Sequence, residues 1–412
     1  MTLMDTPPSS PSVDVEMDED ELVYVGDADE VIEALERDER TEDSEEEAES
    51  YEEQPIKDDA AYVFRNHEGS IFCGALNKDG TLAATGGEDD KAYVWEVSSG
   101  RVVLNCTGHS DSVTFTEFNH DGFYLATADM NGIIQVWKMS NRILIWDYNM
   151  GDMTWMRWHP MANILFAGAS SGVLYMWKIP SGECKIFQSH GQRVEQGVIM
   201  HDGKRITVGY EDGTLRVFDL KSGAVLSTIS CEFGHSSTIT TLDCNSDNNL
   251  LISGGMDGKT ILTTSQSGKV TRVLQDLKTN VSADGDEDAE GNEGNWVEAV
   301  SFCKDPEYPV AVSGTVNGQI FIWDIAKQMI RHEIQQSSGI SKLVWHLNTT
   351  RFYSSGLDGV VRSFDARSGE ELRSYTGHHA DILDLVISRD GKTMLTTSDD
   401  STARIFNIGD PN

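Results

Sequence analysis

The chain has 412 residues, of which 39% are hydrophobic and 24% charged, a composition typical of a globular protein with length enough for one large core or two smaller ones. Its formal net charge of −36 disfavours direct binding of nucleic acid or of anionic membranes and favours basic protein partners. The six cysteines form no CxxC pair, and neither a secretory signal pattern nor an apolar run of about 18 residues occurs. We therefore expect an intracellular protein without membrane insertion.

The first sixty residues carry most of the net negative charge of the chain. They hold 24 acidic and 3 basic residues, so 21 of the 36 net negative charges lie there. Such a segment repels itself and has little apolar surface to bury, and residues 1–59 are interpreted as a disordered acidic tail. The tail either keeps the chain soluble or captures basic partners, and both functions stay open. A second acidic stretch, at about 280–295, is interpreted as a loop insertion because of its Gly and Asp content.

The remaining residues, 60–412, consist of one unit repeated eight times. Each unit has a short strand-like run that ends in an aromatic residue, except that one unit has a threonine there. Successive ends are 42, 40, 41, 45, 60, 41 and 42 residues apart, and the step of 60 contains the acidic insertion, so the period is about 42. The eight end positions are Trp95, Trp137, Trp177, Phe218, Thr263, Trp323, Phe364 and Phe406.

A turn signal lies six residues before each of these ends. It is Asp, Asn or Ser, usually followed by Gly, as in Asp212-Gly213. This pair is typical of a tight β-hairpin because Gly accepts a positive φ without steric cost. A histidine near the start is a further mark of five units, and these starts are His67, Gly108-His109, His190, Gly234-His235 and Gly377-His378.

These repeats resemble those of the WD40 family, whose units of about 40 residues carry Gly-His near the start and Trp-Asp near the end. Trp-Asp itself stands at a unit end only as Trp323-Asp324, with Phe218-Asp219 and Phe364-Asp365 as variants. The resemblance implies an all-β fold, an eight-bladed β-propeller over 60–412 with one four-stranded blade per unit. Too few residues follow the last unit to supply an outer strand, so the run Ala60–Arg65 is expected to complete blade eight and close the ring.

Nothing in the pattern points to an enzyme, a metal site or a cofactor. The histidines fall at the structural start of each unit, where we expect hydrogen-bonded scaffold residues rather than catalytic bases. No His and Cys residues have metal-ligand spacing, and no Gly-rich phosphate loop joins a strand to a helix. We therefore expect a non-enzymatic binding protein, and a monomer, since a closed ring needs no second subunit for its stability.

The resemblance implies that partners bind on the top face, around the central channel. Three positions per unit are expected there, namely the residue before the turn signal and the two residues that flank the apolar anchor of the first strand. These positions include one cation, Arg193, and an acidic surface with apolar side chains suits a Lys/Arg-rich peptide, although so acidic a protein also exposes carboxylates elsewhere. The candidate site consists of seven carboxylates, Glu88, Asp152, Glu195, Glu211, Glu298, Asp381 and Asp399, and of the apolar residues Phe72, Met130, Met256, Trp296 and Leu357.

A narrower resemblance rests on three strings, Gly86–Ala92, Trp155–Pro160 and Val208–Thr214. They are similar to the family of angio-associated migratory cell protein, whose fungal members are chaperones of a late-joining protein of the 60S ribosomal subunit. The resemblance implies a dedicated chaperone in 60S assembly that holds the basic N-terminal segment of a large-subunit ribosomal protein on the acidic top face. It also implies a cytoplasmic location, with passage through the nucleus left open.

Two other functional classes stay open. A ubiquitin-ligase substrate receptor would also be a WD40 propeller, but receptors that read phosphorylated degrons need several top-face arginines, and only Arg193 stands there. A signalling or cell-migration scaffold would use the sides or the bottom of the propeller and would be insensitive to the top-face carboxylates.

Overall fold

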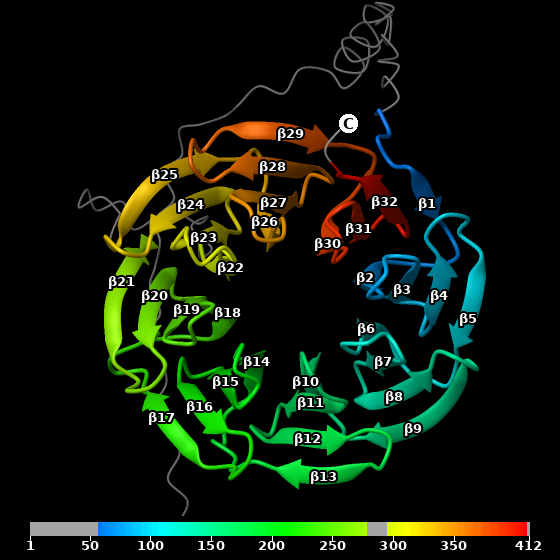
Figure 1. The fold of residues 1–412 in the computed structure, drawn as a ribbon, viewed down its shortest axis with the longest axis horizontal. Coiled ribbons are helices and arrows are strands. Elements are labelled where there is room, and N and C mark those ends of the chain that lie inside the picture. The colour runs from blue at the N-terminus through cyan, green and yellow to red at the C-terminus, as the bar shows by residue number, and fades with distance from the viewer. Residues whose placement is uncertain (1–56, 278–294, 410–412) are drawn as a thin grey trace, which may run out of the picture. The chain divides into compact units, whose positions relative to one another are not determined.

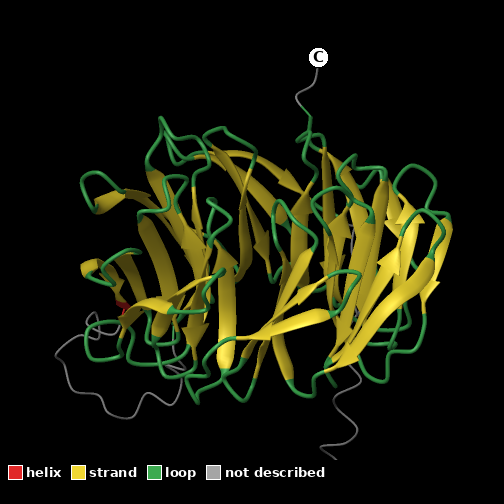
Figure 2. Cartoon of the chain, turned by 60° about the horizontal axis from the view of Figure 1, so that its bottom comes forward, coloured by secondary structure: helices red, strands yellow, loops and turns green. Residues whose placement is uncertain are grey.

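The computed structural model describes residues 57–277 and 295–409. The predicted acidic tail at 1–59 and the insertion at about 280–295 fall almost entirely outside them. The described residues form thirty-two strands in eight four-stranded antiparallel sheets, which surround a central axis as the blades of a propeller (Figure 1). Loops gather at the two opposite faces of the ring (Figure 2). The predicted all-β, eight-bladed propeller is confirmed.

In each blade, four strands follow one another from the central axis outwards, from the innermost to the outermost. Blades 1 to 4 are β2 (Ile71–Leu76), β3 (Leu82–Gly87), β4 (Ala92–Glu96), β5 (Val102–Cys106); β6 (Val113–Phe118), β7 (Tyr124–Asp129), β8 (Ile133–Lys138), β9 (Ile143–Asn149); β10 (Met153–Trp158), β11 (Ile164–Ala169), β12 (Leu174–Lys178), β13 (Glu183–Ile186); and β14 (Val194–Ile199), β15 (Arg205–Tyr210), β16 (Leu215–Asp219), β17 (Val225–Ile229). Blades 5 to 8 are β18 (Ile239–Cys244), β19 (Leu250–Gly255), β20 (Lys259–Thr264), β21 (Val270–Asp276); β22 (Val297–Phe302), β23 (Val310–Thr315), β24 (Gln319–Asp324), β25 (Met329–Gln335); β26 (Ile340–Trp345), β27 (Arg351–Gly356), β28 (Val361–Asp365), β29 (Glu371–Tyr375); and β30 (Ile382–Ile387), β31 (Thr393–Ser398), β32 (Ala403–Asn407), β1 (Tyr62–Phe64).

The hairpin between the second and third strand of each blade explains the turn signal in the sequence. The residue after the signal has a positive φ in all eight blades, and it is glycine in six of them. The two exceptions are Asp90, with φ 58°, and Ser401, with φ 62°. Glycine is therefore favoured, though not obligatory, at this point of the repeat.

The hydrophobic core lies between adjacent blades. The apolar anchor that begins each innermost strand packs on the second strand of the preceding blade. A Cβ atom at Gly168 would lie only 2.3 Å from Cγ1 of Val194, and one at Gly254 only 2.5 Å from Cγ1 of Val297, so these strands approach closely because the glycines have no side chain. The inter-blade contact thus explains the recurrent glycine near the end of the second strand.

Blade 8 is built from both ends of the described chain, as predicted. β1 pairs with β32 through Tyr62 opposite Ile405 and Phe64 opposite Ala403. Residues 57–59, which the sequence assigns to the tail, also contact this blade. Arg404 Nη1, which is buried, donates to Asp58 Oδ2 at 2.7 Å, and Asp59 N donates to the Thr376 carbonyl at 2.9 Å. These bonds fasten the start of the described chain to blade 8 and to the loop that joins blade 7 to it.

Within residues 57–277 and 295–409, no helix has the length and apolar character needed to span a membrane.

Candidate partner-binding site

The top face is the side of the propeller at which the innermost strands begin. In every blade the residue before the turn signal donates its N–H to the carbonyl of the residue before the anchor, at 2.9–3.2 Å. Glu88 is bonded in this way to Ser70, and Asp399 to Asp381. Two of the three predicted positions therefore lie side by side in each blade, and the repeat register brings all of the candidate residues to one face.

The third predicted position is a β-bulge in all eight blades. The register between the first two strands shifts at this residue, as between Ile71 and Cys73, so the residue between them lacks a partner on the neighbouring strand. The bulge residues of six blades, among them Phe72, Glu298 and Leu383, line a central channel of about 860 Å³. The bulge residues of blades 3 and 4, Thr154 and Glu195, are not among the residues that line it.

The first acidic group, Glu88, Asp381 and Asp399, joins blade 8 to blade 1. Ser70 N donates to Glu88 Oε2 at 3.1 Å, and Ser70 Oγ donates to Asp399. Glu88 and Asp399 are exposed and Asp381 is half-buried. Among the described residues, no cation lies within ion-pair distance of these three carboxylates. The group is therefore free to bind a basic side chain from outside.

The second acidic group, Asp152, Glu195 and Glu211, lies on blades 3 and 4. Arg193 Nε is 3.1 Å from Glu195 Oε1, so the one cation among the candidate positions is already paired. Burial raises the pKa of Glu195, the neighbouring Glu211 raises it further, and Arg193 opposes both effects. Asp152 accepts a hydrogen bond from Ser170 Oγ at 3.2 Å. The net charge of the group remains negative.

Glu298 and Trp296 form a third feature, on blade 6. The indole Nε1 of Trp296 donates to Glu298 Oε2 at 2.9 Å, and both side chains are half-buried. Burial raises the pKa of Glu298, because the hydrogen bond from Trp296 compensates only partly for lost hydration. The other apolar candidates differ in exposure, from half-buried Phe72 to Met130, Met256 and Leu357, which are 57%, 45% and 36% exposed. Exposed apolar side chains beside carboxylates are suited to a partner that is both basic and apolar.

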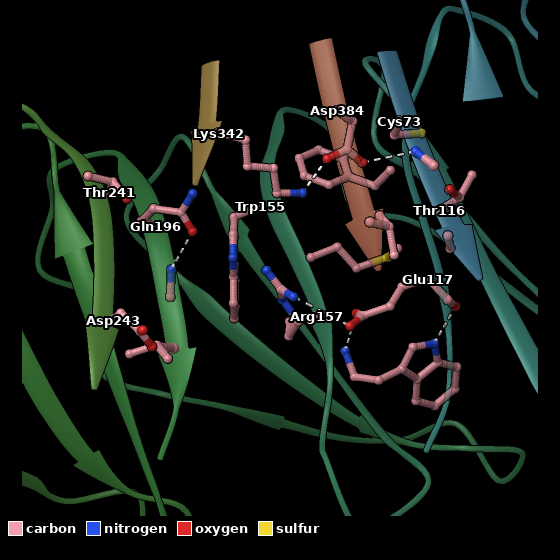
Figure 3. A pocket seen from close by; sticks show the side chains of 18 of the residues that line it. Cys73, Thr116, Glu117, Trp155, Arg157, Gln196, Thr241, Asp243, Lys342 and Asp384 are labelled. Carbon is pink, nitrogen blue, oxygen red and sulfur yellow. Dashed lines mark hydrogen bonds and ion pairs between the residues drawn. The ribbon is translucent and has the colours of Figure 1, made fainter. Parts of the chain in front are cut away.

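The channel wall carries a set of charged residues that the sequence reasoning missed. Glu117, Asp243 and Asp384 project from innermost strands (Figure 3). Each accepts a backbone N–H from the next blade: Glu117 from Trp158 at 2.7 Å, Asp243 from Phe302 at 2.8 Å and Asp384 from Gly74 at 3.0 Å. Each also lies near a cation, which is Arg157, Lys304 and Lys342 respectively.

These wall carboxylates each accept a backbone N–H from the next blade and lie near a cation, whereas Glu88, Asp381 and Asp399 of the top face have no ion-pair partner among the described residues. In the sequence, the wall residues could have been recognised as carboxylates at the third or fifth position of an innermost strand, where apolar residues are otherwise common. Their bonding leaves them less able to receive a partner. The top face is therefore the better candidate for a binding surface.

The repeat histidines are scaffold residues, as predicted. His235 Nδ1 lies 2.9 Å from Asp257 Oδ1, and its Nε2 lies 2.8 Å from Ser253 Oγ. Matching networks surround His67, His109 and His378. No group of three or more His, Cys, Asp or Glu side chains in residues 57–277 and 295–409 is arranged to hold a metal ion.

Comparison with known families and proteins gives consistent results. Residues 59–96 and 100–138 match the WD domain, G-beta repeat, and residues 199–410 match the nucleolar protein 10-like, N-terminal domain. Human angio-associated migratory cell protein is 41% identical over 355 residues, which cover 86% of this chain and 81% of the human protein. The ribosome assembly protein SQT1 of Saccharomyces cerevisiae is 21% identical over 395 residues, covering 84% of this chain and 86% of the yeast protein.

The fold is also found in a solved structure, that of Chaetomium thermophilum Sqt1 bound to the N-terminus of the ribosomal protein L10. It has a TM-score of 0.74 and 21% identity, and the match covers 85% of this chain and all of that one. At this identity the likeness establishes the fold alone. Taken with the human relative and the family matches, it completes the assignment: the chain is a WD-repeat propeller that belongs to the family of angio-associated migratory cell protein, and its residues 199–410 belong to the nucleolar protein 10-like propellers.

Proposed function

We propose that the chain is a non-enzymatic chaperone in 60S ribosome assembly, which holds the basic N-terminal segment of a large-subunit ribosomal protein on its top face. The observation that carries the proposal is the pair of acidic groups on that face, whose carboxylates have only Arg193 as an ion-pair partner among the described residues. A Lys/Arg-rich segment would supply the missing cations. The function is exercised in the cytoplasm, where a newly made ribosomal protein first needs shielding.

The comparisons support this proposal. Two relatives with a similar fold are named for ribosome assembly or for a bound ribosomal protein segment, namely yeast SQT1 and the fungal complex with the N-terminus of L10. The counterpart of that segment is therefore the first ligand to test.

The free energies of surface ion pairs are too small for charge alone to hold the partner. If each of the seven candidate carboxylates formed an ion pair worth roughly 0.2–1 kcal/mol, the usual range at a protein surface, the pairs would contribute about 1.4–7 kcal/mol, whereas a nanomolar complex needs about 12 kcal/mol. The apolar candidates, above all Trp296 and Phe72, have to supply much of the remainder by burial or by contact with cations. Charge mainly sets the rate and selectivity of association.

The test is a calorimetric titration of the full chain with a synthetic peptide of the L10 N-terminal segment, at two salt concentrations. The variant Glu88→Lys/Glu211→Lys/Asp399→Lys changes three exposed top-face carboxylates. Its matched control, Asp247→Lys/Glu307→Lys/Glu370→Lys, alters the net charge equally through exposed carboxylates in loops of the opposite face. We expect salt-sensitive binding that only the first variant abolishes. Absence of binding by the unaltered chain, or equal loss in both variants, would overturn the proposal.

A further inference from the structure

Charge is distributed unevenly around the top face. Blades 5, 6 and 7 have no ionisable residue at two of the three top-face positions, the residue before the anchor and the residue before the turn signal. In the other five blades, six of the ten corresponding residues are ionisable. The six uncharged residues of blades 5 to 7 are Thr238, Met256, Trp296, Val316, Gly339 and Leu357, and we call this set the apolar arc. At the third position, the bulge, Glu298 of blade 6 is the one ionisable residue of these three blades.

The blades that carry the apolar arc lie close to one another at the top face. The blade 5 hairpin meets blade 6 directly, because a Cβ at Gly258 would lie 3.0 Å from the carbonyl oxygen of Asn295, next to Trp296. Blade 6 meets blade 7 more closely still. A Cβ at Gly339 would lie 2.3 Å from the Val316 carbonyl oxygen and 2.9 Å from Leu357 Cδ1.

Because Gly339 has no side chain, the Val316 carbonyl and the Leu357 side chain can both lie close to its Cα atom. The equivalent residue is Arg193 in blade 4 and Asp381 in blade 8, which are the blades on either side of the arc. Met256 and Leu357 remain 45% and 36% exposed, so the arc offers apolar surface that nothing in the described residues covers. Such a surface gains free energy when an apolar side chain of a partner is placed on it.

The acidic groups flank the arc on both sides. The group on blades 3 and 4 ends where blade 5 begins, and the group on blades 8 and 1 begins where blade 7 ends (Figure 1). Outside blades 5 to 7, the candidate carboxylates that follow next along the ring are those of Glu211 in blade 4 and Asp381 in blade 8. A segment that follows the top face from blade 4 to blade 8 therefore meets negative charge, then a mainly apolar surface, then negative charge. Glu298 is the one candidate carboxylate within the apolar part, and it is hydrogen-bonded to Trp296.

We infer that the client segment has basic residues at both ends and apolar or aromatic residues between them, and that the apolar arc of blades 5 to 7 binds these central side chains. The inference rests on the proposed function and adds a rule of selection to it. Basic segments without central apolar residues bind through charge alone and are released faster. Most nuclear and ribosomal tails are basic, so charge by itself would not select one client among them.

The experiment compares three synthetic peptides of equal length and equal charge, titrated into the full chain. The first has leucine and tryptophan between two Lys/Arg clusters, the second has serine in place of these two residues, and the third has them moved to one end. We expect the second and third peptides to bind about tenfold more weakly than the first. The variant Met256→Ser/Leu357→Ser should bind the first peptide about tenfold more weakly and no longer distinguish the three.

Met329→Ser is the matched control, since Met329 is 55% exposed on the outer strand β25 of blade 6, away from the top face. It should behave as the unaltered chain. Equal affinity for all three peptides would overturn the inference and leave the proposed function standing. If no basic peptide binds, the proposed function fails, and the inference fails with it.

Discussion

At the scale of single residues, the histidine networks tie the start of a blade to its hairpin in the blades that contain them. The carboxylate of Asp257 is fully buried and accepts hydrogen bonds from His235 at 2.9 Å and from the Ser236 N–H at 2.8 Å. It therefore ties the start of blade 5 to the hairpin between β19 and β20. The unit keeps its shape although Thr263 stands where the others have an aromatic residue.

Asp257→Asn should destabilise the fold in a pH-dependent way. These hydrogen bonds lower the pKa of Asp257 from 3.8 to about 2 despite its burial. A lowered pKa contributes stability that is present above the unfolded pKa and lost as the pH falls through the folded one. The contribution is about 2 kcal/mol at pH 7. Urea unfolding should show this difference between the two proteins at pH 7, shrinking between about pH 4 and pH 2; a constant difference would contradict it.

The top-face glutamates should make client binding sensitive to mild acid. Because burial raises the pKa of Glu195 and of Glu298, both side chains take up protons at a higher pH than exposed glutamates do. Affinity for a basic peptide should therefore fall on acidification from pH 7 before exposed carboxylates titrate. In Glu195→Gln/Glu298→Gln, affinity should be lower at pH 7 and should change less with pH. Parallel pH profiles in a calorimetric series would refute this expectation.

At the scale of elements, the repeat allowed most of the fold to be predicted, because its signals are local. A glycine after an aspartate marks a hairpin wherever it stands, and the strand count alone showed that the run near Tyr62 has to close blade 8. The bulges were not predictable, since bulge residues such as Phe72, Glu195 and Thr240 share no chemical property. The contacts of Asp384 and of the other wall carboxylates were not predictable either, because they depend on the register of the next blade.

Removal of β1 should destabilise the whole ring. Phe64 is 1% exposed and stacks on Trp95 with ring centroids 4.6 Å apart, so the strand contributes to the core between blades 8 and 1. A chain that begins at residue 66 should lose more than about 3 kcal/mol, the usual cost of losing a buried aromatic side chain. A chain that begins at residue 57 keeps β1 and the bond from Arg404 to Asp58, and should unfold as the full chain does. Equal thermal midpoints for the two truncations would contradict the closure argument.

At the scale of the whole molecule, charge is divided between the propeller and the tail. Residues 1–60 hold 24 acidic and 3 basic residues of the chain's 68 and 32. The top face of the propeller adds its own acidic groups, so a basic client of the proposed kind would meet an attractive field before it reaches the proposed binding surface. Long-range attraction of this kind acts on encounter, whereas the contacts of the top face decide how long the client stays.

Deletion of residues 1–56 should therefore slow association more than it speeds dissociation. At low salt we expect the association rate with the basic peptide to fall about three- to tenfold, with a dissociation rate changed less than about twofold. Stopped-flow measurements at several salt concentrations would separate the two rates. A faster association after deletion would mean that the tail competes with the client instead of steering it.

The closure of blade 8 has a consequence for the proposed binding surface. Ser70 of blade 1 bonds to Glu88 of its own blade and to Asp399 of blade 8, so the acidic group between these blades is assembled from segments 329 residues apart in the chain. Blade 8 is complete only when β1 pairs with β32. Closure of the ring and assembly of this acidic group are therefore a single event in folding.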